Sequence, residues 1–316
     1  MQTALIALIV LGAIPHLLLG GIGLVRLAVQ FPAVGRRLDP VAFAHWARAS
    51  DLGNGLFLYP LLGIGGPVAT WAALAVAEIG RAPGSVMFPL IIAAVLAVLH
   101  VLTTTQAAPT MMRIGRAEDR AEVLTPLIER FAFWSWLRFI LQVLDGAALV
   151  WALIAIRAGA PPLAPALLAI VLAAIACQSI LAGATLDQLI IQLPARQKVG
   201  TAAYAAYLRA TDAANGRVLY PIVGALSNAT TIGAFVLALW LRAPLRVSAL
   251  LGVAAASGVA AFLVARQAIP VVSQLAATGA EDSAGPLLDR LAGNTRSRAP
   301  FFFLAFACLL ATLVAR

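Results

Sequence analysis

The chain has 316 residues, of which 62% are hydrophobic and only 11% are charged, and its mean hydropathy is +0.96. Water-soluble domains carry about 25% charged residues, so the composition excludes that class and predicts a polytopic membrane protein. The formal net charge of +9 does not indicate nucleic-acid binding, because the basic residues gather in the loops on one side of the predicted topology.

Eight apolar runs are long enough to cross a bilayer core, which takes about 20 helical residues. The runs are continuous rather than alternating, which favours helices over a β-barrel. The first run lacks a basic segment before it, so we expect a retained helix rather than a signal peptide. The runs cover residues 3–25, 55–77, 86–102, 139–156, 163–185, 218–241, 247–265 and 301–315, and the last is so short that its helix should begin before Pro300.

The chain contains an internal repeat. Residues 48–63 read RASDLGNGLFLYPLLG and residues 209–224 read RATDAANGRVLYPIVG, with nine identical positions at an offset of 161 residues. Other matches lie at almost the same offset along the whole chain. The sequence therefore predicts a first four-helix repeat at 1–157, a linker at 158–162 that contains Gly and Pro, and a second four-helix repeat at 163–316.

The basic residues predict the orientation. The first, third, fifth and seventh loops, with the helix ends beside them, carry 17 of the 22 Lys and Arg residues. The positive-inside rule places these loops in the cytoplasm and both termini outside. Because each repeat has four spans, the two repeats would run parallel. The Ala- and Arg-rich composition indicates a multi-pass protein of a bacterial plasma (inner) membrane.

One set of polar residues occurs in both repeats, at the start of the second span. Asp51 and Asn54 lie three residues apart and would share a helix face, with Tyr59 a turn further on. These residues could serve as caps and packing contacts, or they could act directly, because ionisable groups at membrane depth are often functional. Asp51 and Asn54 are candidate catalytic residues, and Tyr59 is a candidate substrate-binding residue; their counterparts are Asp212, Asn215 and Tyr220.

The three histidines occur only in the first repeat. His16 and His100 lie in predicted spans, as does Asp145, whereas His45 lies on an amphipathic helix predicted at 40–49, with Asp39 as its N-cap. A buried histidine can be a general base, a metal ligand or a hydrogen-bonded core residue. His16, His100 and Asp145 are the remaining candidate catalytic residues, and with Asp51 and Asn54 nearby they predict one polar pocket in the first repeat. Their counterparts in the second repeat are Gln178, Ala261 and Ala305.

Known motifs for cofactors are absent from the sequence. No HxxH, HExxH or CxxC spacing indicates a metal, so the metal content and the cofactors stay open. No Gly-rich phosphate loop supports nucleotide-driven transport. The glycines at 20, 21 and 23 indicate close helix packing in the first span.

Aromatic residues gather before the fourth apolar run. Trp134, Trp136 and Arg138 would form an interfacial anchor or the mouth of a lipophilic substrate site, and they are candidate substrate-binding residues. The third run ends in a Thr-to-Pro stretch at 103–109. With these motifs, each module resembles the anthrone-oxygenase-like family of small membrane proteins. The resemblance implies oxygenation of a polycyclic phenolic substrate without a bound nucleotide, although the Asn or His typical of the family is missing between Trp134 and Arg138.

Three functions are compatible with these observations. The first is an integral membrane enzyme that acts on a lipophilic or aromatic small molecule, an oxidoreductase whose site lies in the first repeat. The second is a small-solute or proton-coupled transporter built from two parallel repeats. The third is an accessory subunit of a membrane complex. The expected partners are the lipid bilayer and a lipophilic small molecule, with no nucleic acid, and homo-oligomers stay open.

Overall fold

A computed structural model describes residues 1–157, 163–277 and 284–315. The predicted linker at 158–162 lies outside the described residues. About 91% of the chain is helical, and the described residues contain no strand. Eight of the described helical segments are long and apolar enough to cross a membrane. The predictions of an all-α fold and of eight membrane-spanning segments are confirmed.

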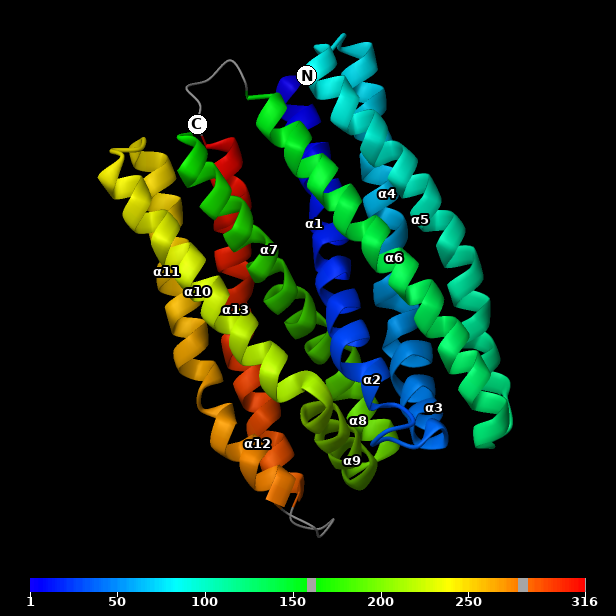
Figure 1. Ribbon diagram of the computed structural model, residues 1–316. Coiled ribbons are helices and arrows are strands. Elements are labelled where there is room, and N and C mark those ends of the chain that lie inside the picture. Colours follow the sequence, from blue (N-terminus) through cyan, green and yellow to red (C-terminus); the bar gives the residue numbers. More distant parts are fainter. Residues whose placement is uncertain (158–162, 278–283, 316) are drawn as a thin grey trace.

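The long helices form the body of the molecule (Figure 1). They are α1 (Gln2–Val25), α4 (Gly55–Ile79), α5 (Gly84–Arg116), α6 (Ala121–Ala155), α7 (Pro165–Asp187), α10 (Arg217–Trp240), α11 (Leu245–Ala265) and α13 (Ala284–Val314). Shorter helices lie at one end: α2 (Phe31–Ala33), α3 (Pro40–Ala49), α8 (Leu193–Val199), α9 (Thr201–Thr211) and α12 (Ala268–Ala277).

Several long helices extend beyond the apolar runs that predicted them. The run at 86–102 belongs to α5, which continues to Arg116, and the run at 301–315 belongs to α13, which begins before Pro300 as expected. The polar turns stay helical because one face of each is buried. Leu124 and Ile128 of α6 and Leu288 of α13 are at most 4% exposed. An apolar run marks the part of a helix that lipid surrounds, and not where the helix ends.

The predicted amphipathic helix at 40–49 is confirmed as α3. Pro40 occupies its first turn, where a missing N–H costs nothing. Asp39 is the N-cap residue as predicted, but its side chain makes no capping hydrogen bond. Helix α3 therefore depends on its buried face, which includes Phe43 and Trp46.

Four π-helical turns interrupt the helices at corresponding places. They are η1 (Arg26–Gln30), η2 (Ser50–Asn54), η3 (Gln188–Gln192) and η4 (Asp212–Gly216). In η2 the backbone of Gly53 leaves the helical range, with φ −91° and ψ −116°. A π turn leaves backbone carbonyls without their usual helical donors, and such turns are frequent at functional sites.

The long helices form two groups of four that meet at α1 and α7 (Figure 1). Helix α1 packs against α4, α6 and α7, and α7 packs against α10, α13 and α1. Each group has its own apolar core, and a third core joins the two groups at the end with the short helices. Both ends of the chain lie at the opposite end of the molecule.

Glycines allow α1 and α7 to approach closely. A Cβ built on Gly21 of α1 would lie 2.5 Å from the carbonyl oxygen of Ser179 in α7. A Cβ on Gly183 of α7 would collide with the carbonyl oxygen of Leu18 in α1. Close packing by small residues in the first span was predicted from the sequence, and Gly21 confirms it.

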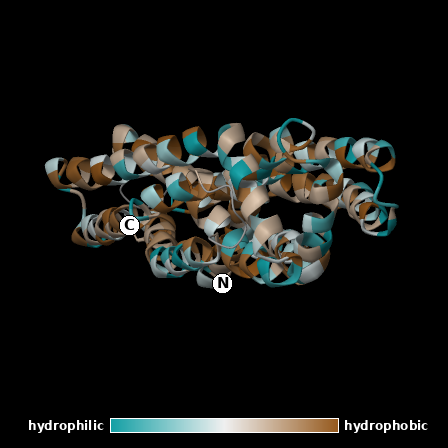
Figure 2. Cartoon of the chain, turned by 90° about the horizontal axis from the view of Figure 1, so that it is seen from below, coloured by the Kyte–Doolittle hydropathy of each residue, from teal (hydrophilic) through white to brown (hydrophobic). Residues whose placement is uncertain are grey.

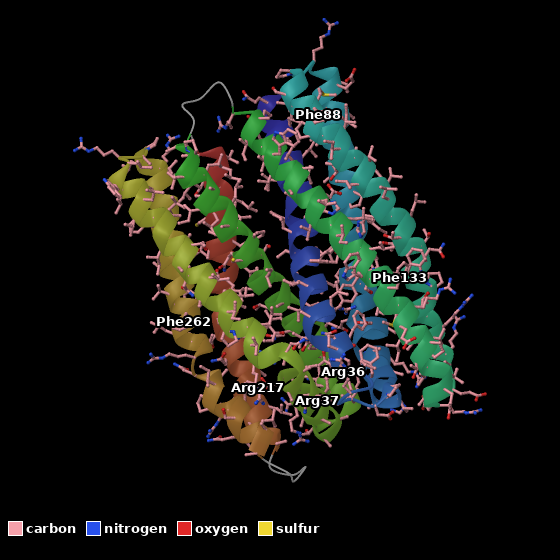
Figure 3. The ribbon with its side chains drawn as sticks, viewed as in Figure 1. Arg36, Arg37, Phe88, Phe133, Arg217 and Phe262 are labelled. Atoms are coloured by element: carbon pink, nitrogen blue, oxygen red, sulfur yellow. The ribbon has the colours of Figure 1, made fainter. Side chains whose placement is uncertain are left out.

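The outer surface suits a lipid environment. Phe88, Phe133 and Phe262 are about half exposed, at 57%, 57% and 48%, on separate helices (Figure 3). Arg36, Arg37 and Arg217 lie at the end with the short helices. Seen from that end, hydrophobic residues run along the helices, and hydrophilic residues occupy much of the connecting chain (Figure 2).

Candidate functional site

Four polar side chains meet inside the first group of helices. His16 of α1 lies with Nε2 3.1 Å from Oδ2 of Asp145 in α6, and both side chains are fully buried. His100 of α5 lies with Nε2 3.1 Å from Nε2 of Gln142, one turn before Asp145. The two imidazole rings are 5.7 Å apart in an edge-to-face arrangement. We call these four residues the histidine cluster.

A glycine on the neighbouring helix α4 leaves room for the ring of His16. A Cβ built on Gly66 of α4 would lie 2.9 Å from Nε2 of His16, so any larger residue there would displace the ring. Thr103 and Thr104 donate hydrogen bonds to the carbonyl oxygen of His100. The sequence had grouped His16, His100 and Asp145 in one polar pocket, and the fold brings all three together.

The histidine cluster contains polar atoms that have no hydrogen-bond partner among the described residues. They are both ring nitrogens of His16, Nδ1 of His100 and both carboxylate oxygens of Asp145. The contact of His16 with Asp145 is a short ion-pair distance that does not meet hydrogen-bond geometry. Buried polar atoms normally have partners. The cluster is therefore equipped to exchange protons with, or donate hydrogen bonds to, a small molecule or water.

In the second group of helices, none of the residues that correspond to His16, His100 and Asp145 is titratable. Gln178, the counterpart of His16, donates a hydrogen bond to the carbonyl oxygen of Phe302 at 2.9 Å. Ser227, the counterpart of Gly66, donates to Oε1 of Gln178 at 2.7 Å. Ala261 and Ala305 replace His100 and Asp145. The second place is thus a hydrogen-bonded core, whereas the first carries acid–base groups.

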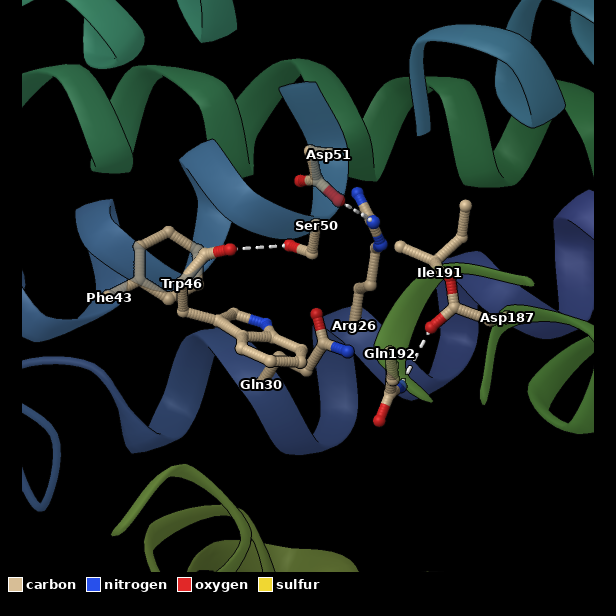
Figure 4. A pocket seen from close by; sticks show the side chains of 9 residues that line it. All are labelled: Arg26, Gln30, Phe43, Trp46, Ser50, Asp51, Asp187, Ile191 and Gln192. Carbon is tan, nitrogen blue, oxygen red and sulfur yellow. Dashed lines mark hydrogen bonds and ion pairs between the residues drawn. The ribbon is translucent and has the colours of Figure 1, made fainter. Parts of the chain in front are cut away.

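A second polar cluster lies where the two groups of helices meet (Figure 4). Arg26 donates hydrogen bonds to Asp51 and to the hydroxyl of Tyr59, each at 2.5 Å. The hydroxyl of Tyr59 in turn donates to Asp187 at 2.5 Å, and Gln192 donates to the other oxygen of Asp187 at 2.8 Å. We call these five residues the seam network.

A small cavity adjoins the seam network. Its volume is about 10 Å³, which is room for about one water molecule. Trp46 and Ser50 line it together with four members of the network, Tyr59 excepted. The predicted residues Asp51 and Tyr59 therefore belong to a charged contact between the two halves of the chain, separate from the histidine cluster.

Asn54, the last candidate catalytic residue, also contacts the other half. Its side-chain amide donates to the carbonyl oxygen of Ile190 in η3 at 2.9 Å. Its counterpart Asn215 donates to the carbonyl oxygen of Ala28 in η1 at 2.6 Å. Both acceptors lie in π-helical turns, where carbonyls lack their usual donors.

The candidate substrate-binding residues of α6 are spread along one turn. Trp136 is 52% exposed toward the surroundings, whereas Trp134 is partly buried and packs on Phe133 at 5.3 Å between ring centres. Arg138 is within electrostatic range of Arg26, Tyr59 and Asp51 in the seam network and also of His100.

Sequence reasoning missed Arg26 as a site residue. The sequence did contain a signal for it. Arg26 is a charged residue at the end of an apolar run, and its counterpart in the second repeat is the neutral Gln188. Gln188 instead accepts a hydrogen bond from Arg298 at 2.8 Å. Gln192 was also missed, because it was read only as part of a motif that ends the span.

The third histidine lies outside both clusters. Nε2 of His45 lies 2.8 Å from Oδ2 of Asp119, and Arg48 donates to the other oxygen at 2.5 Å. Hydrogen bonds from His45 and Arg48 lower the pKa of Asp119, which is exposed in the loop between α5 and α6. This contact ties α3 to that loop.

Among the described residues, no group of three or more His, Cys, Asp or Glu side chains is arranged to hold a metal ion. Comparison with protein-family models, with curated proteins and with solved structures finds no match to this chain. The two clusters are therefore the features of this chain that point to a function.

Proposed function

We propose that this protein is an integral membrane enzyme, an oxidoreductase that acts on a lipophilic or aromatic small molecule at the histidine cluster. The observation that carries the proposal is the contrast between the halves. His16, His100 and Asp145 form a buried acid–base group with unpartnered atoms, whereas the counterpart Gln178 is satisfied by Ser227 and Phe302. Buried ionisable groups inside a membrane protein are costly and therefore favour a functional role.

The proposed chemistry begins with a proton transfer. Nδ1 of His16, whose Nε2 is held near Asp145 at 3.1 Å, would accept a proton from an acidic O–H or C–H group of the substrate. Asp145 would stabilise the imidazolium that forms. His100, positioned by Gln142, would donate a hydrogen bond to the anion. Molecular oxygen would then oxidise the anion, so that a ring CH2 group becomes C=O and the second oxygen atom leaves as water. This reaction class rests on the resemblance to the anthrone-oxygenase-like family, in which the oxidised molecule is a polycyclic phenol.

The proposed setting is a bacterial plasma (inner) membrane, with two parallel four-helix repeats and both termini outside. The order of helices and π turns is similar in 1–157 and 163–315. Asn54 and Asn215 make equivalent contacts with opposite halves. These contacts support a module that was duplicated and then specialised, with the site kept in the first copy.

Substitutions that copy the second repeat test the proposal. His16→Gln, His100→Ala and Asp145→Ala each install the counterpart residue, and Gln178→Ala is the matched control in the second half. Oxygen uptake with a tricyclic phenol of the anthrone class, and mass spectrometry of bound lipophilic molecules, are the readouts. Loss of a general base lowers rates by about 10²–10⁴-fold, so we expect that loss in the first three variants and little change in the control.

Two results would count against the enzyme. One is a purified wild-type protein that holds no lipophilic molecule and consumes no oxygen with any phenol tested. The other is equal loss of activity in Gln178→Ala and His16→Gln, because a general packing defect would then explain both.

The seam network favours a second candidate function, a proton-coupled transporter. Its charged residues come from both halves and adjoin a cavity of about 10 Å³, as a central pathway would require. Proton flux into liposomes separates the candidates. Asp187→Asn should abolish flux if the protein is a transporter, whereas the enzyme proposal predicts no flux in any variant.

A further inference from the structure

A groove open to the surroundings lies where η2 and η3 meet, apart from both polar clusters. It has a volume of about 450 Å³ and is lined by Gly53, Asn54, Leu56, Phe57 and Ile190. Asn54 and Ile190, which both line it, are joined by a hydrogen bond of 2.9 Å. The groove therefore joins the two halves of the chain at a place where the helical backbone is interrupted on both sides.

The wall of the groove is apolar and faces lipid. Leu56 is 52% exposed, Phe57 is 71% exposed and Ile190 is 38% exposed. Helix α4 runs from Gly55 to Ile79, so a bilayer core of about 20 helical residues leaves its first residues at the membrane interface. An acyl chain can lie along this wall while its headgroup stays at the level of η2.

The ammonium group of Lys198 lies beside Gly53, one of the residues that line the groove. A Cβ built on Gly53 would lie 3.0 Å from Nζ of Lys198, so the absence of a side chain at Gly53 lets the ammonium reach the rim. Lys198 is exposed, and no carboxylate of the described residues forms an ion pair with it. Arg196, two residues earlier, is already paired with Asp289 at 2.8 Å. Lys198 is thus available to a phosphate.

The corresponding positions in the second repeat carry different residues. Ala214 replaces Gly53, Val218 replaces Phe57 and Arg217 replaces Leu56. Arg217 is paired with Asp212 at 2.8 Å. Arg36, the counterpart of Lys198, is exposed at the same end of the molecule. The combination of apolar wall, glycine and unpaired lysine therefore belongs to one side of the molecule only.

We propose that this groove binds one anionic phospholipid from the bilayer. Its acyl chain lies against Leu56, Phe57 and Ile190, and its phosphate pairs with Lys198. Lipid-facing grooves with basic rims on the cytoplasmic side are the places where anionic headgroups bind. The proposal is independent of the chemistry at the histidine cluster, because no residue is shared.

Native mass spectrometry of delipidated protein tests this binding with phosphatidylglycerol and with phosphatidylcholine of identical chains. One lysine near the surface contributes about fivefold in affinity for an anionic lipid. We expect the first phosphatidylglycerol to bind wild type at least fivefold more tightly than phosphatidylcholine. Lys198→Gln should remove that preference, Leu56→Trp should weaken both lipids, and Arg36→Gln, the matched control, should keep the preference.

Either of two results would overturn the proposal. One is a wild-type protein that shows no preference between the two lipids. The other is a preference for phosphatidylglycerol that Arg36→Gln and Lys198→Gln reduce equally. Lys198 has no ion pair to lose, so Lys198→Gln should unfold at the wild-type temperature. That measurement, made on each variant, separates a lost lipid site from a damaged fold.

Discussion

Asn54 and Asn215 make the same contact with opposite halves of the molecule. Asn54 donates to the carbonyl oxygen of Ile190, and Asn215 donates to that of Ala28. The two donors are 161 residues apart and the two acceptors are 162 residues apart. The duplicated Asn-Gly motif thus joins the halves through the π turns η1 and η3, which explains why both copies contain it.

We predict that Asn54→Ala and Asn215→Ala each lower the free energy of unfolding by about 0.5–1.5 kcal/mol, the usual contribution of one hydrogen bond. Asn228→Ala is the control, because Asn228 donates only within its own helix, to Gly224. Reversible unfolding in detergent measures all three. If Asn228→Ala lowered the free energy of unfolding as much as the other two variants, the contacts of Asn54 and Asn215 between the halves would have no special importance.

The close approach of α1 and α7 predicts that replacing a glycine at their contact by alanine lowers the stability of the protein. Gly21→Ala should destabilise the protein by about 1–3 kcal/mol, because the new methyl group meets backbone atoms of Ser179 and Ile180 that cannot move aside. Gly224→Ala should instead stabilise α10 by about 0.5–1 kcal/mol, because nothing lies within 4 Å of the new Cβ. Thermal unfolding of the two variants should therefore shift in opposite directions.

We predict that the histidine cluster lowers the free energy of unfolding of the protein and that its role is functional. Asp145→Ala removes a buried carboxylate whose oxygens lack hydrogen-bond partners, so we expect unchanged or higher stability together with lost activity. Gln178→Ala leaves Ser227 without its acceptor and should cost about 1–3 kcal/mol. Unfolding midpoints of both variants provide the comparison. Strong destabilisation by Asp145→Ala would instead favour a structural role for the His16–Asp145 pair.

The contact at Asp119 predicts a dependence of stability on pH. The pKa of Asp119 is lower in the folded state than in the unfolded chain, because His45 and Arg48 bind the carboxylate. Its stabilising effect is therefore complete above the unfolded pKa, about 4, and disappears as the pH falls through the folded value.

Asp119→Asn should accordingly unfold earlier than wild type at pH 7, and the difference should shrink as the pH falls below about 4. Midpoints measured across that range give the comparison. Glu118→Gln is the control, since the carboxylate of Glu118 is exposed and 3.8 Å from Arg120. A difference in unfolding midpoint between wild type and Asp119→Asn that stays constant with pH would contradict the contact of Asp119 with His45 and Arg48.

Much of the candidate site could be foreseen because its residues break the repeat. His16, His100 and Asp145 stood out as ionisable groups in apolar runs whose counterparts are neutral. The prediction that Asp51 and Asn54 share a pocket with them was wrong. Asp51 and Asn54 lie in η2, next to the other half of the chain, whereas His16 and Asp145 lie within the first group of helices.

The sequence by itself determined that the chain is helical, that eight segments can span a membrane and that one half carries the histidines. Apolar length, charge and repetition are properties of neighbouring residues, so they can be read along the chain. Only the tertiary structure decided which polar groups meet. His16 and Asp145 are 129 positions apart, and Tyr59 reaches Asp187 across the two halves, because helix packing, and not spacing along the chain, brings such side chains within hydrogen-bond distance.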